Sequence, residues 1–184
     1  CLGGTLLSMA AATMAREGDE RLKTITLFAS QVDFEDAGEL LLFIDESQIT
    51  FLEDVMWEKG YLDSSRLAGT FNMLRSYDLV WSLGVDQYLL GKRYQFTDLM
   101  AWNADATRLP YKMHSEYLRK LFLHNELSNG KFTVGDQPIV LNNIKAPIFS
   151  VATQKDHISP WKSVYKIHLF TDTETTFLLT SGGH

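Results

Sequence analysis

Cysteine is nearly absent from this sequence, since Cys1 is the only one among 184 residues. A single cysteine excludes an internal disulfide framework and a zinc site built from several cysteines, so it predicts a reducing compartment and a cytoplasmic location. Long apolar runs are also missing. No segment approaches the roughly 18 uninterrupted apolar residues of a membrane span, and no basic and then apolar signal sequence precedes Cys1. We therefore expect no membrane-spanning segment.

Positive charge is in short supply as well. The 17 Lys and Arg residues are outnumbered by 23 Asp and Glu residues, which gives a net charge of −6 and a pI of about 5.3. Nucleic-acid-binding domains normally carry a basic surface that neutralises phosphates, so we expect no nucleic-acid partner. The sequence also lacks internal repeats and low-complexity tracts. A length of single-domain size and 45% hydrophobic residues predict a globular chain with a substantial core.

The first 32 residues have the pattern of part of a β/α/β unit. Cys1 is followed by two glycines and by a helix expected over residues 6–16, which is rich in small residues and ends before Gly18. Residues 23–30 are nearly continuous in apolar and β-branched character, which is typical of a strand buried on both faces. Cys1 is therefore expected at a tight turn beside a buried sheet.

The last 50 residues repeat this pattern of strands followed by polar residues. A strand expected over residues 147–153 leads to Asp156, and a second over residues 175–180 leads to His184. Between them, Ser159 and Pro160 are expected as the N-cap and the first-turn proline of a helix to about residue 169. Because ligands of open α/β sheets bind at the carboxyl ends of the strands, Asp156 and His184 are expected to lie close together.

Cys1, Asp156 and His184 appear in the order nucleophile, acid and histidine. This is the order of the α/β-hydrolase triad and not that of chymotrypsin or subtilisin. A cysteine at a helix N-terminus has a lowered thiol pKa, and the backbone N–H of Leu2 is placed as one oxyanion donor. A second donor would come from sequence upstream of Cys1, so we expect the isolated chain to be inactive.

Each of these residues also has a simpler interpretation. Cys1 can be a small buried hydrophobic residue, or an N-terminal nucleophile whose own α-amino group is the base. Asp156 can be a turn residue, and His184 can be a solvated loop residue. His157, next to the acid, is a rival for the role of base. The remaining histidines lack partners at metal-ligand spacing and are expected to be structural, so no metal site is predicted; they are His114, His124 and His168.

The middle of the chain has a different character. Residues 33–134 are rich in tryptophan, tyrosine, phenylalanine and leucine at helical spacings, with acidic and glycine breaks. An insertion of this size after a core strand predicts a mostly helical cap over the active site. The expected organisation is hydrolase core at 1–32, cap at 33–134, and hydrolase core again at 135–184.

Several motifs together resemble polyhydroxyalkanoate synthases, most closely the class I form. In chain order they are Cys1-Leu2-Gly3-Gly4-Thr5, Asp33-Phe34, Asp78-Leu79-Val80-Trp81, Tyr88-Leu89-Leu90-Gly91, Trp102-Asn103-Ala104-Asp105-Ala106-Thr107-Arg108-Leu109-Pro110, Tyr117-Leu118-Arg119, Asn125-Glu126-Leu127, Asp156-His157-Ile158-Ser159-Pro160-Trp161 and Ser181-Gly182-Gly183-His184. They span essentially the whole chain, and the tryptophan-containing motifs at 102–110 and 156–161 are the specific ones. The segment 94–99 departs from the family pattern, which concerns details of the cap only.

The resemblance implies a partial α/β-hydrolase fold in which cysteine replaces the serine of the nucleophile turn, with the triad on Cys1, Asp156 and His184. It implies an acyltransferase that polymerises (R)-3-hydroxyacyl-coenzyme A, the substrate, through an acyl-cysteine, without a cofactor. It also implies a homodimer attached to polyester granules in the cytoplasm. Two alternatives remain open: a thioesterase or lipase-like hydrolase, and a non-catalytic module whose aromatic-rich cap binds granules.

Overall fold

The computed structural model describes residues 1–66, 69, 80–93, 97–105 and 107–184. The chain divides into two compact units. The first consists of Cys1–Ile49 together with Glu116–His184, and the second of Thr50–Ser115. The predicted cap, residues 33–134, is longer than the second unit, and its assignment as a cap stays a prediction. Within the described residues, no helix is both long and apolar enough to cross a bilayer.

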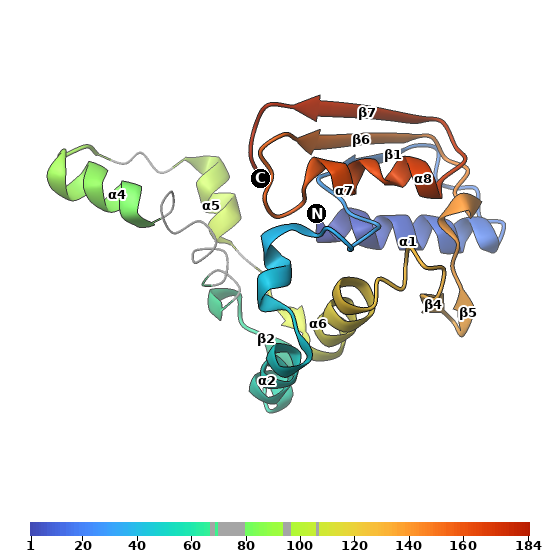
Figure 1. Cartoon of the computed structure of the whole chain (residues 1–184), viewed down its shortest axis with the longest axis horizontal. Coiled ribbons are helices and arrows are strands. Elements are labelled where there is room, and N and C mark those ends of the chain that lie inside the picture. Colours follow the sequence, from blue (N-terminus) through green and yellow to red (C-terminus); the bar gives the residue numbers. More distant parts are fainter. Residues whose placement is uncertain (67–68, 70–79, 94–96, 106) are drawn as a thin grey trace. The chain divides into compact units, whose positions relative to one another are not determined.

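A three-stranded parallel sheet organises the first unit (Figure 1). Its strands are β1 (Ile25–Phe28), β6 (Ile148–Thr153) and β7 (Thr175–Thr180), in the order β1-β6-β7. Ile25 is in register with Ile148, and Ile148 with Thr175. All three predicted strands are confirmed, and their parallel pairing with intervening helices confirms the α/β class.

Helix α1 (Leu2–Arg16) packs its small residues against this sheet. Its buried positions are Thr5, Ser8, Met9, Ala11 and Ala12, which recur at helical spacing on one face. The helix begins four residues earlier than expected and includes both glycines in its first turn. It ends as predicted, since Gly18 follows with a φ of +75°, a conformation that glycine adopts without a steric penalty.

Strand β1 is buried on one face only, so the expectation of burial on both faces is wrong for this chain. Ile25 and Leu27 are buried, whereas Thr26 and Phe28 are exposed, with 64% of Phe28 accessible. Alternate side chains of a strand point to opposite faces of the sheet. Leu27 points toward Gly4 of α1, and among the described residues no comparable cover buries the face that carries Phe28.

The connection from β6 to β7 contains two short helices, α7 (Trp161–Tyr165) and α8 (Ile167–Phe170). The expected helix is therefore divided at Lys166. The residue at its N-cap is Pro160 and not Ser159, because Pro160 has extended backbone angles (φ −53°, ψ 134°) and the helix starts after it. Ser159 is fully buried and makes other contacts.

The rest of the first unit supplies a second part of the core. The 3-10 helices Gly38–Phe43 (η1) and Leu141–Asn143 (η5), the π-helix Tyr117–Leu123 (η4), and a hairpin of β4 (Thr133–Val134) with β5 (Gln137–Pro138) belong to it. Phe34 lies at the centre of a ring cluster, 4.7 Å from Phe122 and 6.1 Å from Tyr117 between centroids. Aromatic burial of this kind stabilises the segment that follows β1.

Helices predominate between residues 33 and 134, as predicted, within the part that the structure describes. Helix α2 (Glu46–Trp57) and helix α6 (Tyr111–Glu116) each cross a boundary between the units. The second unit contains α4 (Ser82–Gly84), the π-helix Val85–Leu89 (η3), α5 (Asp98–Ala104), and β2 (Tyr61–Leu62) paired antiparallel with β3 (Leu109–Pro110). The motif residues Asp78, Leu79 and Ala106, and part of the segment 94–99, lie outside the described residues.

Candidate active site

Asp156 and His184 form a direct pair at the carboxyl ends of β6 and β7. Nδ1 of His184 lies 2.8 Å from Oδ2 and 3.0 Å from Oδ1 of Asp156. Backbone hydrogen bonds hold the two loops together: the amide of Gln154 donates to the carbonyl of Thr180 at 2.7 Å, and that of Lys155 to Gly182 at 3.0 Å. Parallel strands thus bring an acid and a histidine 28 residues apart within bonding distance, as the sequence predicts.

The carboxylate of Asp156 is enclosed by donors. Its side chain has no exposed surface, and Oδ1 accepts hydrogen bonds from the amides of Ile158 (2.9 Å) and Ser159 (2.8 Å). Burial by itself raises the pKa of this carboxyl, but the hydrogen bonds from His184 and the two amides outweigh it and leave the pKa below its ordinary value of 3.8. Asp156 is therefore a buried anion that fixes the imidazole of His184.

Cys1 lies at the N-terminus of α1, beside the same loop. Its backbone carbonyl accepts hydrogen bonds from the amides of Gly4 (3.0 Å) and Thr5 (3.3 Å), and these are the first hydrogen bonds of the helix. Its sulfur lies 3.9 Å from the hydroxyl of Ser159, a residue whose amide is bound to Asp156. Figure 1 marks the two chain ends at the same end of the sheet. Position at a helix N-terminus favours the thiolate.

The predicted oxyanion donor is the first residue of that helix. Leu2 occupies the first turn of α1, where helix geometry gives an N–H no intrahelical acceptor. Such an N–H can bind a developing negative charge on a substrate oxygen. The oxyanion role of Leu2 stays a prediction.

The other candidate bases have different surroundings. The carbonyl of His157 accepts the amide of Glu39 at 2.9 Å, and it is His184 that pairs with the acid. The α-amino group of Cys1 donates to the carbonyl of Phe28 at 2.7 Å, and burial lowers its pKa. These contacts favour His184 as the base. The alternative roles of His157 and of the α-amino group stay untested hypotheses.

The remaining histidines have other surroundings. His114 is buried, and burial lowers its pKa; His168 lies 4.6 Å from the ring of Tyr165, and Nδ1 of His124 lies 3.9 Å from Glu126. Across the described ranges, no three His, Cys, Asp or Glu residues are grouped so that they could hold a metal ion.

Ser159 is the site residue that the sequence interpretation missed. The sequence predicts that it caps a helix, whereas its amide binds Asp156 and its hydroxyl faces Cys1. An aspartate whose side chain accepts hydrogen bonds from the backbone amides two and three residues later forms an Asx turn. The short spacing from Asp156 to Ser159, followed by proline, is the signal that could have indicated this turn.

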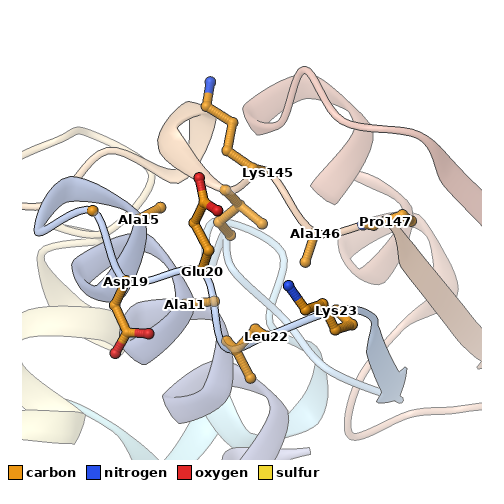
Figure 2. A pocket seen from close by; sticks show the side chains of 11 residues that line it. Ala11, Ala15, Asp19, Glu20, Leu22, Lys23, Lys145, Ala146 and Pro147 are labelled. Carbon is orange, nitrogen blue, oxygen red and sulfur yellow. The ribbon is translucent and has the colours of Figure 1, made fainter.

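A separate cavity of about 370 Å³ lies at the opposite end of the sheet, near the starts of β1 and β6 (Figure 2). It is lined in part by Ala11 and Ala15 of α1 and by Lys23, Lys145 and Pro147. Figure 2 shows Glu20 and Lys145 extending to the same side of it. None of Cys1, Asp156 and His184 lines this cavity, so it adds nothing to their chemistry.

A parallel sheet that carries an acid and a histidine after successive strands, beside a cysteine at a helix N-terminus, has the architecture of an α/β-hydrolase, here in part. No family model matches the sequence. One solved structure, α/β hydrolase domain-containing protein 10 from mouse, aligns over 98% of this chain and 50% of its own, at 14% identity and a TM-score of 0.41.

Curated poly(3-hydroxyalkanoate) polymerases match the chain along its whole length. Identity is 45% over 184 residues with the polymerase subunit PhaC of Rhizobium meliloti, 44% over 184 residues with the polymerase of Methylorubrum extorquens, and 37% over 190 residues with the PhaC subunit of Cupriavidus necator. The chain spans 30%, 30% and 32% of these relatives. The match covers about a third of each polymerase, and it confirms the resemblance to this family noted above.

Proposed function

We propose that this chain supplies the nucleophile, acid and base of an acyltransferase that polymerises (R)-3-hydroxyacyl-coenzyme A into polyhydroxyalkanoate and releases coenzyme A. The observation that carries the proposal is the 2.8 Å pair of His184 and Asp156. Ser159 links this pair to the nucleophile, because its amide binds Asp156 and its hydroxyl lies 3.9 Å from the sulfur of Cys1, in a chain 45% identical to a polymerase subunit. Because the chain spans only 30% of that relative, the proposal concerns the role of this segment within a longer polymerase.

The first step is acylation of Cys1. His184 accepts the proton of the thiol, and the thiolate attacks the thioester carbonyl of the substrate. The N–H of Leu2 binds the oxyanion of the tetrahedral intermediate. When that intermediate collapses, the bond to the coenzyme A sulfur breaks, coenzyme A leaves with the proton from the imidazolium, and an acyl-cysteine remains.

The second step extends the polyester. The hydroxyl of another hydroxyacyl unit, or of the growing chain end, gives its proton to the base, His184, and attacks the carbonyl carbon of the acyl-cysteine. An ester bond forms, the bond to the Cys1 sulfur breaks, and the thiolate is regenerated. Since the side chain of Asp156 is fully buried, its part in this step is to hold and polarise His184. Exclusion of water from the acyl-cysteine separates a polymerase from a thioesterase.

The test uses a chimera in which this chain replaces the matching segment of the Rhizobium meliloti polymerase. Incubated with (R)-3-hydroxybutyryl-coenzyme A, it should release coenzyme A and form insoluble polyester, and the Cys1→Ala chimera should do neither and take up no acyl group. Release of free hydroxy acid without polymer would identify a hydrolase. Granule binding without coenzyme A release would identify a non-catalytic module, and acyl labelling of the Cys1→Ala chimera would exclude Cys1 as nucleophile.

The same resemblance extends the proposal to assembly and location. We propose that the polymerase acts as a homodimer on cytoplasmic polyester granules. Size-exclusion chromatography with light scattering on the chimera, and its co-sedimentation with purified granules, test these two statements separately from the chemistry.

A further inference from the structure

The hydroxyl of Ser159 is buried against the sulfur of Cys1. Ser159 has no exposed surface, and its Oγ lies 3.9 Å from Sγ of Cys1, within the range of hydrogen bonds to sulfur. The residue is held in place by its amide, which donates to Oδ1 of Asp156 at 2.8 Å. One residue therefore contacts both the nucleophile and the acid of the candidate site.

Because the Ser159 hydroxyl is buried, its contact with the Cys1 sulfur indicates a hydrogen bond. A hydroxyl removed from water needs a hydrogen-bond partner, and within the described part of the chain the recorded partner of Ser159 Oγ is the Cys1 sulfur. A thiol can donate or accept, but a thiolate can only accept. Once Cys1 is ionised, the hydroxyl of Ser159 is the donor, and this hydrogen bond to a charged acceptor is stronger than its counterpart with the neutral thiol.

We propose that Ser159 is a positioning residue that donates a hydrogen bond to the thiolate of Cys1 and fixes the sulfur on the loop that carries Asp156. The helix N-terminus and the hydroxyl of Ser159 then stabilise the same negative charge from two directions. The catalytic meaning of this contact rests on the proposed function of Cys1 as nucleophile. The contact itself is a property of the chain without substrate.

The experiment measures the reactivity of Cys1 in the 184-residue chain. Because Cys1 is the only cysteine, the rate of alkylation by iodoacetamide, followed by intact mass spectrometry, reports on this sulfur alone. In Ser159→Ala the midpoint of the rate against pH should move to higher pH, and the rate at pH 7 should fall by about threefold to tenfold. In 8 M urea the two chains should react at the same rate.

A matched pair separates the hydroxyl from the shape of the side chain. Ser159→Thr keeps the donor, whereas Ser159→Val has nearly the same shape without it. The Thr variant should keep the native dependence of the Cys1 alkylation rate on pH. The Val variant should show the same shift to higher pH as Ser159→Ala. Ser163→Ala is the control for loss of a buried hydroxyl elsewhere, because that hydroxyl donates to the carbonyl of Asp33 at 2.7 Å. Circular dichroism establishes which variants are folded.

An unchanged profile in folded Ser159→Ala overturns the proposal, as do equal profiles for the Thr and Val variants. The result is independent of polymer formation. A shifted profile together with a chimera that makes no polymer would refute the polymerase and leave the contact standing. An unchanged profile together with an active chimera would refute the contact alone.

Discussion

Gly38 lies against the backbone of His157, so closely that a β-carbon at position 38 would be 2.3 Å from the His157 carbonyl oxygen. The same carbonyl accepts the amide of Glu39 at 2.9 Å. The start of η1 therefore packs against the loop that follows Asp156 and is hydrogen-bonded to it. The φ of Gly38 is +77°, a conformation that residues with a β-carbon rarely adopt.

Gly38→Ala is expected to destabilise the chain by about 3 kcal/mol or more, since backbone strain and a backbone clash add together. Gly18→Ala is the matched control. Gly18 also has a positive φ, +75°, but a β-carbon there meets none of the described residues within 4 Å, so only the strain of about 1 kcal/mol applies. Urea unfolding at pH 7 measures both variants. Equal losses in the free energy of unfolding would show that the close approach to His157 adds nothing to the destabilisation by Gly38→Ala.

The two glycines after Cys1 are predicted to respond in opposite directions to alanine. A β-carbon on Gly4 would lie 2.6 Å from Cβ of Ser30, whereas one on Gly3 meets no atom within 4 Å in the part of the chain that the structure describes. Gly4→Ala should therefore cost about 2 kcal/mol through overpacking, and Gly3→Ala should stabilise the exposed first turn of α1 by up to about 1 kcal/mol. Thermal unfolding of the two variants tests this, and destabilisation by Gly3→Ala would contradict it.

Asp33, which is nearly buried, and the half-buried Lys166 form an ion pair at 2.7 Å, and Asn125 also binds the Asp33 carboxylate. Burial acts to raise the pKa of Asp33, but hydrogen bonds from Lys166, Asn125 and the Glu35 amide hold it below 3.8. The hydrogen bond that Lys166 donates to Asp33 raises the pKa of Lys166 above 10.5. The pair stabilises the fold above the unfolded-state pKa of Asp33 and below that of Lys166. This stability is lost as pH falls through the lowered pKa or rises through the raised one.

A double-mutant cycle measures this pair. Lys166→Met should destabilise the chain by about 2–3 kcal/mol at pH 7, because it leaves a buried carboxylate with fewer partners. Asp33→Asn combined with Lys166→Met should lose less than the sum of the single variants, by at least about 1 kcal/mol. The coupling should disappear at acid pH, below the lowered pKa of Asp33. A coupling that persists there would show that the two side chains interact through packing alone.

Asp156→Asn should weaken the fold in a pH-dependent way. The pKa of Asp156 lies below 3.8, so the carboxylate contributes stability above that pH and loses it as pH falls through the lowered pKa. We expect a loss of about 1–3 kcal/mol between pH 5 and 8, with the gap to the native chain closing at lower pH. Urea unfolding across pH 3–8 measures the gap. A constant gap would mean that the stabilisation does not depend on the charge of Asp156.

In the polymerase chimera, Asp156→Asn should slow elongation more than the first acylation. A thiol ionises near neutral pH with modest help, whereas the attacking alcohol needs the full strength of the His184 base. We expect elongation to fall by about 100-fold or more, and acylation by clearly less. Single-turnover measurements of acyl-cysteine formation and of its transfer separate the two rates. Equal slowing of both steps would refute this division of roles.

The sequence was sufficient for the elements that frame the site. Short apolar and β-branched runs identified β1, β6 and β7, because such runs suit a pleated, half-buried surface. The order of Cys1, Asp156 and His184, read with the rule that parallel strands end at one edge, then predicted the observed pair of Asp156 and His184. These inferences depend on local pattern and connectivity alone.

The remaining features depended on which surfaces meet in three dimensions. Phe28 is exposed because the described residues cover one face of β1 and not the other. Gly4 needs to be glycine because Ser30 lies against it, whereas none of the described residues lies against Gly3. Ser159 reads locally as a helix cap, yet it contacts Cys1 across 158 positions of sequence. Sequence pattern sets backbone conformation and the face a residue occupies. Only the folded chain decides which distant side chain occupies the space opposite, because that depends on close packing of whole elements.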